Sequence, residues 1–223
     1  MAEGRISADQ MRKYLRMYLV IGSVNCQEYP LQVLEEALAG GVTLVQFREK
    51  GPGSLAGEAR LALALQMQAA CGRAGVPFII NDDVDLALRI GADGVHIGQD
   101  DEDPARVRAR IGNRLLGVSA HTAEEARLAA SQGADYLGIG PIYPTVSKDD
   151  ANAVQGPGIL RELRGAGIDL PLVGIGGITA ARAGEVIGAG ADGVAVISAV
   201  TGRPLGGIKA AVKEIIGQME CLK

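Results

Sequence analysis

The chain has 223 residues, of which 48% are hydrophobic and 22% are charged, and its net charge is −4. This composition excludes a disordered chain, and the acidic balance argues against nucleic acid or membrane as a partner, because such surfaces need excess positive charge. Its three cysteines are odd in number and far apart, and no apolar run is long enough to span a membrane, so we expect a cytoplasmic protein that acts on small molecules.

The chain repeats a short apolar run followed by a longer segment of helical period. A first helix is predicted from Ser7, which with Gln10 matches a capping box. Strands are predicted at residues 16–22, 42–48, 77–80, 93–97, 115–119, 136–140, 171–175 and 193–197. Eight such units fill 223 residues as a single-domain (β/α)8 TIM barrel over residues 1–223, with an extra N-terminal helix. An open doubly wound sheet remains the alternative, because periodicity does not show closure.

Glycine is frequent, with 32 residues, and part of the excess has a structural explanation. Gly91, Gly133 and Gly190 each open a Gly-Ala-Asp sequence between a helix and a strand. A glycine at that position ends a helix in the left-handed conformation. These sequences therefore mark a recurring corner of the fold.

Polar residues gather where the predicted strands end, which in a barrel is the mouth that carries the active site. After the second strand, side-chain alternation places Gln46, Arg48 and Lys50 on one face. Two cations and an amide at this edge suit a bound anion. A solvated charge run is the alternative for these residues taken alone.

Acidic residues follow the third and fourth strands. Mg²⁺ takes one or two carboxylates together with water and phosphate oxygens, so one aspartate from each strand end suits it. Asp83 is expected to cap the next helix instead. Asp101 has no evident structural role, because Asp103-Pro104 already starts the helix that follows.

Ser119 follows the fifth strand, and Thr122 with Glu125 is predicted to cap the helix after it, which leaves Ser119 for a ligand. His96 lies inside an apolar strand and is expected to be a core or wall residue. His121 lies at the mouth, and a catalytic role for it in acid–base chemistry is the less favoured reading.

The last strand ends supply glycine and hydroxyl groups. A long loop, residues 140–148, carries hydroxyls and a lysine, and Gly176-Gly177 and Ser198 follow the seventh and eighth strands, where barrels bind phosphate. The sequence therefore predicts a cationic site with two aspartates, suited to a Mg²⁺-bound diphosphate, and a glycine and serine cup, suited to a monophosphate. An enzyme that joins two phosphorylated substrates with loss of diphosphate needs both sites.

The sequence resembles the thiamine phosphate synthase family. The motifs are VQFREK at 45–50, NDD at 81–83, GVHIGQDD at 94–101, GVSAHT at 117–122, GPIYPT at 140–145 with Lys148, GIGGI at 174–178 and VIS at 196–198. One departure is the loop PTVSK, where a threonine before the lysine is expected. The resemblance implies a Mg²⁺-dependent transfer of a pyrimidinylmethyl group from its diphosphate to a thiazole phosphate, with or without a carboxylate on the thiazole. The products are thiamine phosphate and diphosphate.

The resemblance also implies roles for individual residues. The pyrimidine diphosphate is expected to contact Gln46, Phe47, Arg48, Glu49, Lys50, Asn81, Ser119 and Lys148. The thiazole phosphate is expected to contact Thr145, Val146, Ser147, Gly177, Ile197 and Ser198. Asp82 and Asp101 are the expected Mg²⁺ ligands, and Arg48, Lys50, Ser119 and Lys148 are the expected catalytic residues.

The implied mechanism is dissociative: diphosphate leaves first, and the thiazole nitrogen then attacks a stabilised cation. The sequence agrees, since it offers charge-stabilising groups and no evident nucleophile–base pair. Two alternatives remain, a thiazole tautomerase that uses a residue such as His121 and a non-catalytic barrel that senses a phosphorylated metabolite. The sequence does not decide between a monomer and a homo-oligomer.

Overall fold

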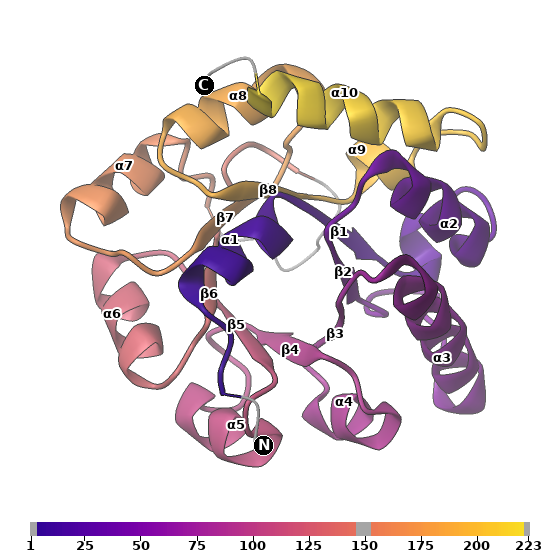
Figure 1. Ribbon diagram of the computed structural model, residues 1–223, viewed down its shortest axis with the longest axis horizontal. Coiled ribbons are helices and arrows are strands. Elements are labelled where there is room, and N and C mark those ends of the chain that lie inside the picture. Colours follow the sequence, from indigo (N-terminus) through magenta and orange to yellow (C-terminus); the bar gives the residue numbers. More distant parts are fainter. Residues whose placement is uncertain (1–3, 146–152, 221–223) are drawn as a thin grey trace.

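Eight parallel strands close into a barrel in the computed structural model, which describes residues 4–145 and 153–220. Strand β1 pairs with β2 on one side and with β8 on the other, so the sheet has no free edge (Figure 1). The predicted TIM barrel is therefore confirmed, and the open sheet is excluded. The strands are β1 (Met17–Ile21), β2 (Leu44–Phe47), β3 (Phe78–Asn81), β4 (Gly94–Ile97), β5 (Leu115–Ala120), β6 (Tyr136–Ile139), β7 (Leu172–Ile175) and β8 (Gly193–Val196).

Helices surround the sheet, and α1 lies across one end of the barrel (Figure 1). They are α1 (Ala8–Leu15), α2 (Pro30–Gly40), α3 (Gly57–Ala74), α4 (Val84–Ile90), α5 (Pro104–Ile111), α6 (Ala123–Ser131), α7 (Gly158–Gly165), α8 (Ala180–Gly188), α9 (Ser198–Thr201) and α10 (Ile208–Glu220), with a 3₁₀ turn at Ser23–Asn25. In the part of the chain that the structure describes, no helix combines the length and apolar character that crossing a membrane requires.

The predicted strands match the observed ones to within two residues at either end. The predicted helix starts are also confirmed where side chains cap them. Ser7 accepts a hydrogen bond from the Gln10 N–H, and Asp103 accepts one from the Arg106 N–H. These local bonds depend only on neighbours in sequence, which is why the sequence shows them.

The Gly-Ala-Asp corners hold the start of the preceding strand. Their glycines have positive φ, as predicted. Their aspartates, Asp93, Asp135 and Asp192, accept hydrogen bonds at 2.8–2.9 Å from the N–H groups of Phe78, Leu116 and Leu172, respectively. We call these three residues the corner aspartates. Each one connects two neighbouring strands at the end of the barrel away from the mouth.

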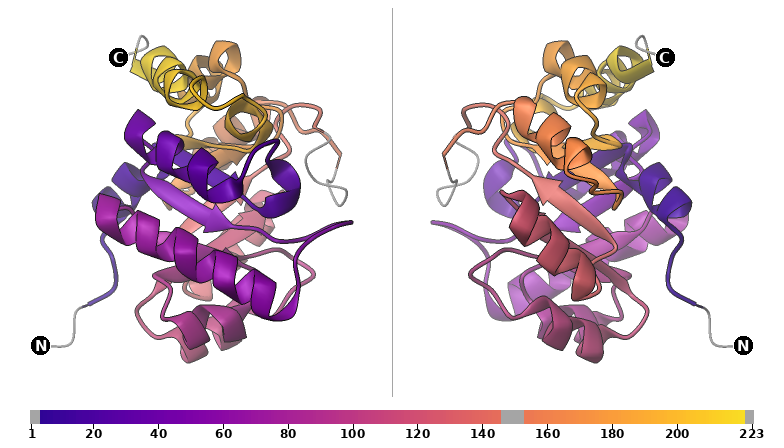
Figure 2. Two further views of the ribbon diagram at one scale, coloured as in Figure 1. Left: turned by 90° about the vertical axis from the view of Figure 1, so that its right-hand side faces the viewer. Right: turned by 90° about the vertical axis from the view of Figure 1, so that its left-hand side faces the viewer.

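Helix α1 closes the end of the barrel opposite the mouth. Its Met11 and Leu15 are fully buried in the same apolar cluster as Tyr18 and Leu44, whose side chains fill the barrel interior. The N-terminal segment before α1 lies at this end in the side views of Figure 2. Active-site chemistry is therefore confined to the other end.

Some glycines make room inside the barrel. A Cβ on Gly117 would lie 2.2 Å from the Tyr136 ring and 2.4 Å from Nδ1 of His96. A Cβ on Gly138 would lie 2.9 Å from Cε1 of His96. Because the barrel interior is closely packed, these two strands carry no side chain where their neighbours carry large rings.

We predict opposite effects for two glycine-to-alanine changes. Gly117→Ala forces Tyr136 or His96 to move and should lower the free energy of unfolding by roughly 1–3 kcal/mol. Gly72→Ala, in α3 and with nothing within 4 Å of the added methyl, should raise it by roughly 0.5–1 kcal/mol. Urea unfolding followed by circular dichroism measures both, and a neutral Gly117→Ala would contradict this account of the interior.

Candidate active site

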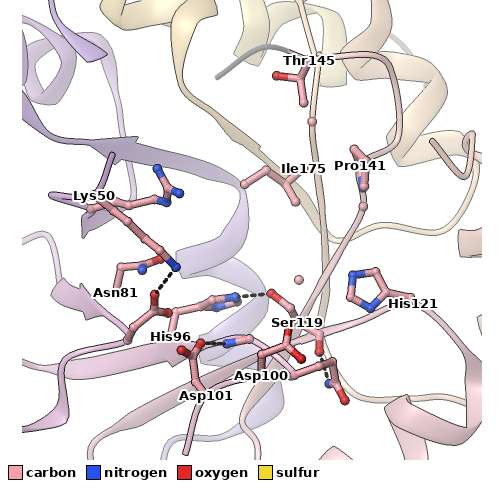
Figure 3. Close-up of a pocket in the computed structure, with 17 residues that line it drawn as sticks. Lys50, Asn81, His96, Asp100, Asp101, Ser119, His121, Pro141, Thr145 and Ile175 are labelled. Carbon is pink, nitrogen blue, oxygen red and sulfur yellow. Dashed lines mark hydrogen bonds and ion pairs between the residues drawn. The ribbon is translucent and has the colours of Figure 1, made fainter. Parts of the chain in front are cut away.

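A pocket opens where strands β2 to β7 end, and most of the polar residues predicted for the mouth line it (Figure 3). These residues come from different strands and are distant in sequence. Barrel closure brings their side chains to one place. The predicted residues that line this first pocket are Arg48, Lys50, Asn81, Asp82, Asp101, Ser119 and Thr145.

The cationic edge forms one wall of the first pocket. Arg48 is only 5% exposed, and its backbone N–H donates to the carbonyl of Ile21 in β1. Lys50 is half exposed, and its Nζ lies 3.2 Å from Oδ2 of Asp82. A guanidinium held out of bulk water attracts an anion more strongly than a solvated one, because the local dielectric constant is low.

Asp82 and Asp101 lie close together in the first pocket, next to Lys50 of the cationic edge. Burial raises the pKa of Asp82, and the negative charge of Asp101 raises it further, while Lys50 opposes both effects. Asp82 also has a positive φ of 60°, a conformation that few non-glycine residues adopt and that often marks a functional site. Two repelling carboxylates beside a pocket are suited to a divalent cation, which relieves the repulsion.

Asp101 does have a structural contact, contrary to expectation. Its Oδ2 accepts a 2.7 Å hydrogen bond from the N–H of Gly98 and so closes the turn after β4. This turn is not visible in the sequence as a capping pattern. Asp83 behaves as predicted: it caps α4 and pairs with Arg60. Among the residues of ranges 4–145 and 153–220, no cluster of three or more His, Cys, Asp or Glu side chains suits a metal.

Three residues expected to contact substrate have other partners. Gln46 lies one layer deeper in the barrel, where its Nε2 donates to the Tyr18 hydroxyl at 2.6 Å. Phe47 packs against Phe78 on the outer face of the sheet. Glu49 accepts from the N–H groups of Ser23 and Leu55 and so holds the loops after β1 and β2 together.

None of these three side chains lines either of the two pockets described here. The expectation for Phe47 and Glu49 came from their place in a motif, although strand alternation already puts both on the face opposite Arg48. Phe47 and Glu49 are therefore not among the proposed substrate contacts.

Ser119 is not free, because His96 bonds to it. The Nε2 atom of His96 lies 3.0 Å from Oγ of Ser119, as the dashed line in Figure 3 shows. His96 is 8% exposed and forms part of the pocket wall, which agrees with the expectation for it. The sequence missed the contact because it depends on the register of β4 against β5, in which His96 pairs with Gly117.

His121 also lies in the first pocket and has a carboxylate partner. Its Nδ1 is 3.1 Å from Oε2 of Glu125, which also accepts from the His121 N–H at 2.7 Å. Thr122 caps α6 through the Glu125 N–H, as predicted. The glutamate thus reaches one residue beyond the cap, a variation on the expected capping box.

A second pocket adjoins the first, between the ends of β7 and β8. The predicted residues Gly177, Ile197 and Ser198 line it. Thr145, Ile175 and Gly176 line both pockets, so the two share a wall. The predicted residues Val146, Ser147 and Lys148 lie outside the described part of the chain.

Two arginines of the second pocket were not predicted. Arg182 stacks 4.5 Å from the centre of the Tyr143 ring and donates to the carbonyl of Gly177, and Arg203 follows α9. Both lie on helices or loops several residues after the strand ends. Position at a strand end therefore does not predict them.

Gly176 and Gly177 are required by a neighbouring loop. Both have positive φ, and a Cβ on Gly177 would lie 2.4 Å from the carbonyl oxygen of Pro144. We expected these glycines to let the main chain approach a ligand. What approaches them here is the loop after β6, which shapes the shared wall of the two pockets.

Comparison with known proteins shows the family. A family model described as thiamine monophosphate synthase matches residues 17–200. The chain belongs to this family. It is 60% identical over 200 residues to the thiamine-phosphate synthase of Geobacillus kaustophilus (strain HTA426), covering 90% of each chain. It is 57% identical over 197 residues to that of Bacillus cereus (strain 03BB102), covering 88% of this chain and 90% of the relative.

A solved structure agrees with this assignment to the thiamine monophosphate synthase family. The thiamine phosphate pyrophosphorylase from Pyrococcus furiosus superposes with a TM-score of 0.83 at 32% identity, covering 95% of this chain and 98% of that one. The family resemblance inferred from the motifs is therefore confirmed.

The aspartate pair gives a prediction for metal-free protein. Asp101→Asn removes a negative charge beside Asp82, so the pKa of Asp82 should fall. Carboxyl carbon NMR during a pH titration measures it. Asp9→Asn, an exposed position in α1, is the control and should leave it unchanged. An unchanged Asp82 in the Asp101 variant would contradict the proximity of the two charges.

Proposed function

We propose that this chain joins a pyrimidine diphosphate to a thiazole phosphate and releases diphosphate, forming thiamine phosphate. Its family consists of transferases of thiamine biosynthesis, and its own residues support this reaction. The observation that carries the proposal is the pair of pockets with a shared wall at Thr145, Ile175 and Gly176. Two phosphorylated substrates can thus be bound side by side, which lowers the entropic cost of bringing them together.

In the first pocket, Arg48, Lys50 and Asn81 are proposed to hold the diphosphate. All three side chains line the first pocket where β2 and β3 end. Their positive charge stabilises the negative charge that grows on the diphosphate as its bond to carbon breaks. Asn81 lies at the end of β3 and the Arg48 N–H is bonded to Ile21 of β1, so these two donors are held in place before the reaction.

Asp82 and Asp101 are proposed to hold Mg²⁺. The donor set fits this ion, because two carboxylates leave room for the water and phosphate oxygens that Mg²⁺ retains. When bound, the ion would supply further positive charge to the leaving diphosphate. Lys50, which pairs with Asp82 at 3.2 Å, would then be available to the diphosphate itself.

The second pocket is proposed to hold the thiazole phosphate through Gly177, Ile197 and Ser198. Arg182 and Arg203 add positive charge to this pocket. Lys148, Val146 and Ser147 keep the roles that the family resemblance implies for them, as predictions. We also propose a cytoplasmic location and action on small molecules, and the net charge of −4 argues against a nucleic-acid or membrane partner.

One observation favours a second candidate, a thiazole tautomerase. His121 is paired with the carboxylate of Glu125, the arrangement that an acid–base catalyst needs. A tautomerase, however, has no evident use for the Asp82 and Asp101 pair or for the buried Arg48. The synthase therefore accounts for more of the first pocket.

The assay that tests the proposal combines purified protein with both substrates and Mg²⁺. Thiamine phosphate and diphosphate should appear in equal amounts, and a chelator should abolish their formation until Mg²⁺ is restored in excess. Isomerisation of the thiazole without metal would instead establish the tautomerase. If the protein binds one of the two phosphorylated substrates and forms no product, the result would support the non-catalytic barrel that senses a phosphorylated metabolite.

Asp82→Ala should separate catalysis from stability. We expect kcat to fall by roughly 10²-fold or more, since the charge opposite the diphosphate is no longer balanced by a bound cation. The midpoint of thermal unfolding should change little, because the relief from removing a repelling, partly buried carboxylate is offset by the strain of alanine at a positive φ. Asp85→Ala is the matched control: it is highly exposed on α4 and should leave kcat unchanged. Near-normal diphosphate release by Asp82→Ala would overturn the metal role.

A further inference from the structure

A chain of hydrogen bonds crosses the barrel interior and ends in the first pocket. Nε2 of Gln46 lies 2.6 Å from the Tyr18 hydroxyl, which lies 2.9 Å from the Tyr136 hydroxyl. The Tyr136 hydroxyl is 2.9 Å from Nδ1 of His96, and Nε2 of His96 is 3.0 Å from Oγ of Ser119. We call these five side chains, from β2, β1, β6, β4 and β5, the tyrosine relay.

The relay has a direction, and Gln46 sets it. The amide nitrogen of Gln46 donates to the Tyr18 oxygen, so the single hydrogen of Tyr18 is left to donate to Tyr136. The Tyr136 hydrogen then donates to Nδ1 of His96. A neutral imidazole that accepts at Nδ1 carries its proton on Nε2, so His96 donates to Ser119.

The relay is built to keep this direction. Tyr18 and Tyr136 are 1% and 0% exposed and meet edge to face, with ring centres 6.0 Å apart. Burial raises the pKa of both hydroxyls, so each keeps the one hydrogen that the argument requires. Gly117 leaves the space that the Tyr136 and His96 rings occupy. Burying polar groups costs free energy that an apolar interior would not cost. Because these buried groups form an unbroken chain of hydrogen bonds to the pocket, we infer that the chain has a function there.

We propose that Tyr136 is a positioning residue that acts through His96 and makes Ser119 a hydrogen-bond donor to the bound substrate. A serine beside a histidine usually suggests a nucleophile and its base. Here the histidine nitrogen nearest the serine already carries a proton and cannot accept another. Ser119 therefore keeps its own hydrogen, which is directed toward an acceptor in the pocket.

This role deepens the proposed function and rests on it for the substrate. A serine that does not attack cannot capture the pyrimidinyl group or a phosphoryl group in a covalent side reaction. Its hydroxyl adds instead to the donors of Arg48 and Lys50 around the same pocket. The direction of the relay is a property of the protein alone, so it can be tested without substrate.

The first test is nitrogen-15 NMR of histidine-labelled protein without substrate. The chain has two histidines, and His121→Gln assigns the signals of His96. We expect neutral His96 with its proton on Nε2, and we expect Tyr136→Phe, which removes the donor to Nδ1, to allow the other tautomer. A proton on Nδ1 in the unaltered protein, or no response to Tyr136→Phe, would overturn the proposal whatever the enzyme's activity.

The second test is a double-mutant cycle on turnover. Tyr136→Phe should lower kcat roughly tenfold, the effect of one misdirected hydrogen bond, and should have little further effect in a Ser119→Ala background. Tyr18→Phe leaves the Tyr136 donor in place and should have a smaller effect. Tyr29→Phe, an exposed tyrosine bonded to Gln66, is the control and should have none.

The outcomes of the two tests are distinguishable. Independent effects of Tyr136→Phe and Ser119→Ala on kcat would overturn the positioning role even if the tautomer is as expected. Failure to form thiamine phosphate at all would overturn the proposed function and leave the NMR result standing. If Tyr136→Phe does not fold, Tyr18→Phe replaces it in both the NMR measurement and the double-mutant cycle. The expected changes in the His96 tautomer and in kcat are then smaller but measurable.

Discussion

The limited volume inside the closed barrel is the constraint on which the rest of the structure depends. Eight strands enclose just enough space for side chains, so a large ring on one strand requires a small residue on its neighbour. Tyr136 and His96 occupy the middle of this space because Gly117 and Gly138 leave it open. Polar atoms placed there must pair with one another, since α1 closes one end and water reaches only the mouth. The tyrosine relay is the pairing that results, and it ends at the pocket.

Stability and chemistry are separated along the barrel axis. At the closed end, the corner aspartates hold strand starts, and Asp135 is fixed between Arg5 and Arg108 while its carboxylate accepts the Leu116 N–H. At the mouth, by contrast, the carboxylates of Asp82 and Asp101 repel each other and a non-glycine residue has positive φ. Such unfavourable contacts persist only where the surrounding structure is rigid enough to hold them. The closed end thus carries ion pairs that hold the strands, and the mouth carries the carboxylates that are proposed to hold Mg²⁺.

The sequence predicts what depends on local pattern and misses what depends on register. Strand positions, the caps at Ser7 and Asp103 and the placement of Arg48 and Lys50 at the mouth follow from periodicity and neighbouring residues. The bond between His96 and Ser119 follows from how β4 lies against β5, which no local pattern encodes. The contacts of Glu49, whose side chain holds two loops together, are likewise not encoded in the motif to which it belongs. Thus the location of the site was predictable, but the partners of each side chain were not.

The shared wall between the pockets is where the two substrates would meet, and its chemistry is suited to a dissociative transfer. Of the three residues of this wall, Ile175 and Gly176 carry no charge and no nucleophile, and Thr145 carries an uncharged hydroxyl. An electron-poor carbon formed beside Ile175 and Gly176 would contact apolar and backbone atoms on the protein side, so the thiazole nitrogen is the favoured nucleophile. The relay serves the same end, because it withholds from Ser119 the base that would make it a competitor. In this proposal the thiazole phosphate is selected as the nucleophile because the protein's own nucleophiles are kept inactive, and not because the protein activates a nucleophile.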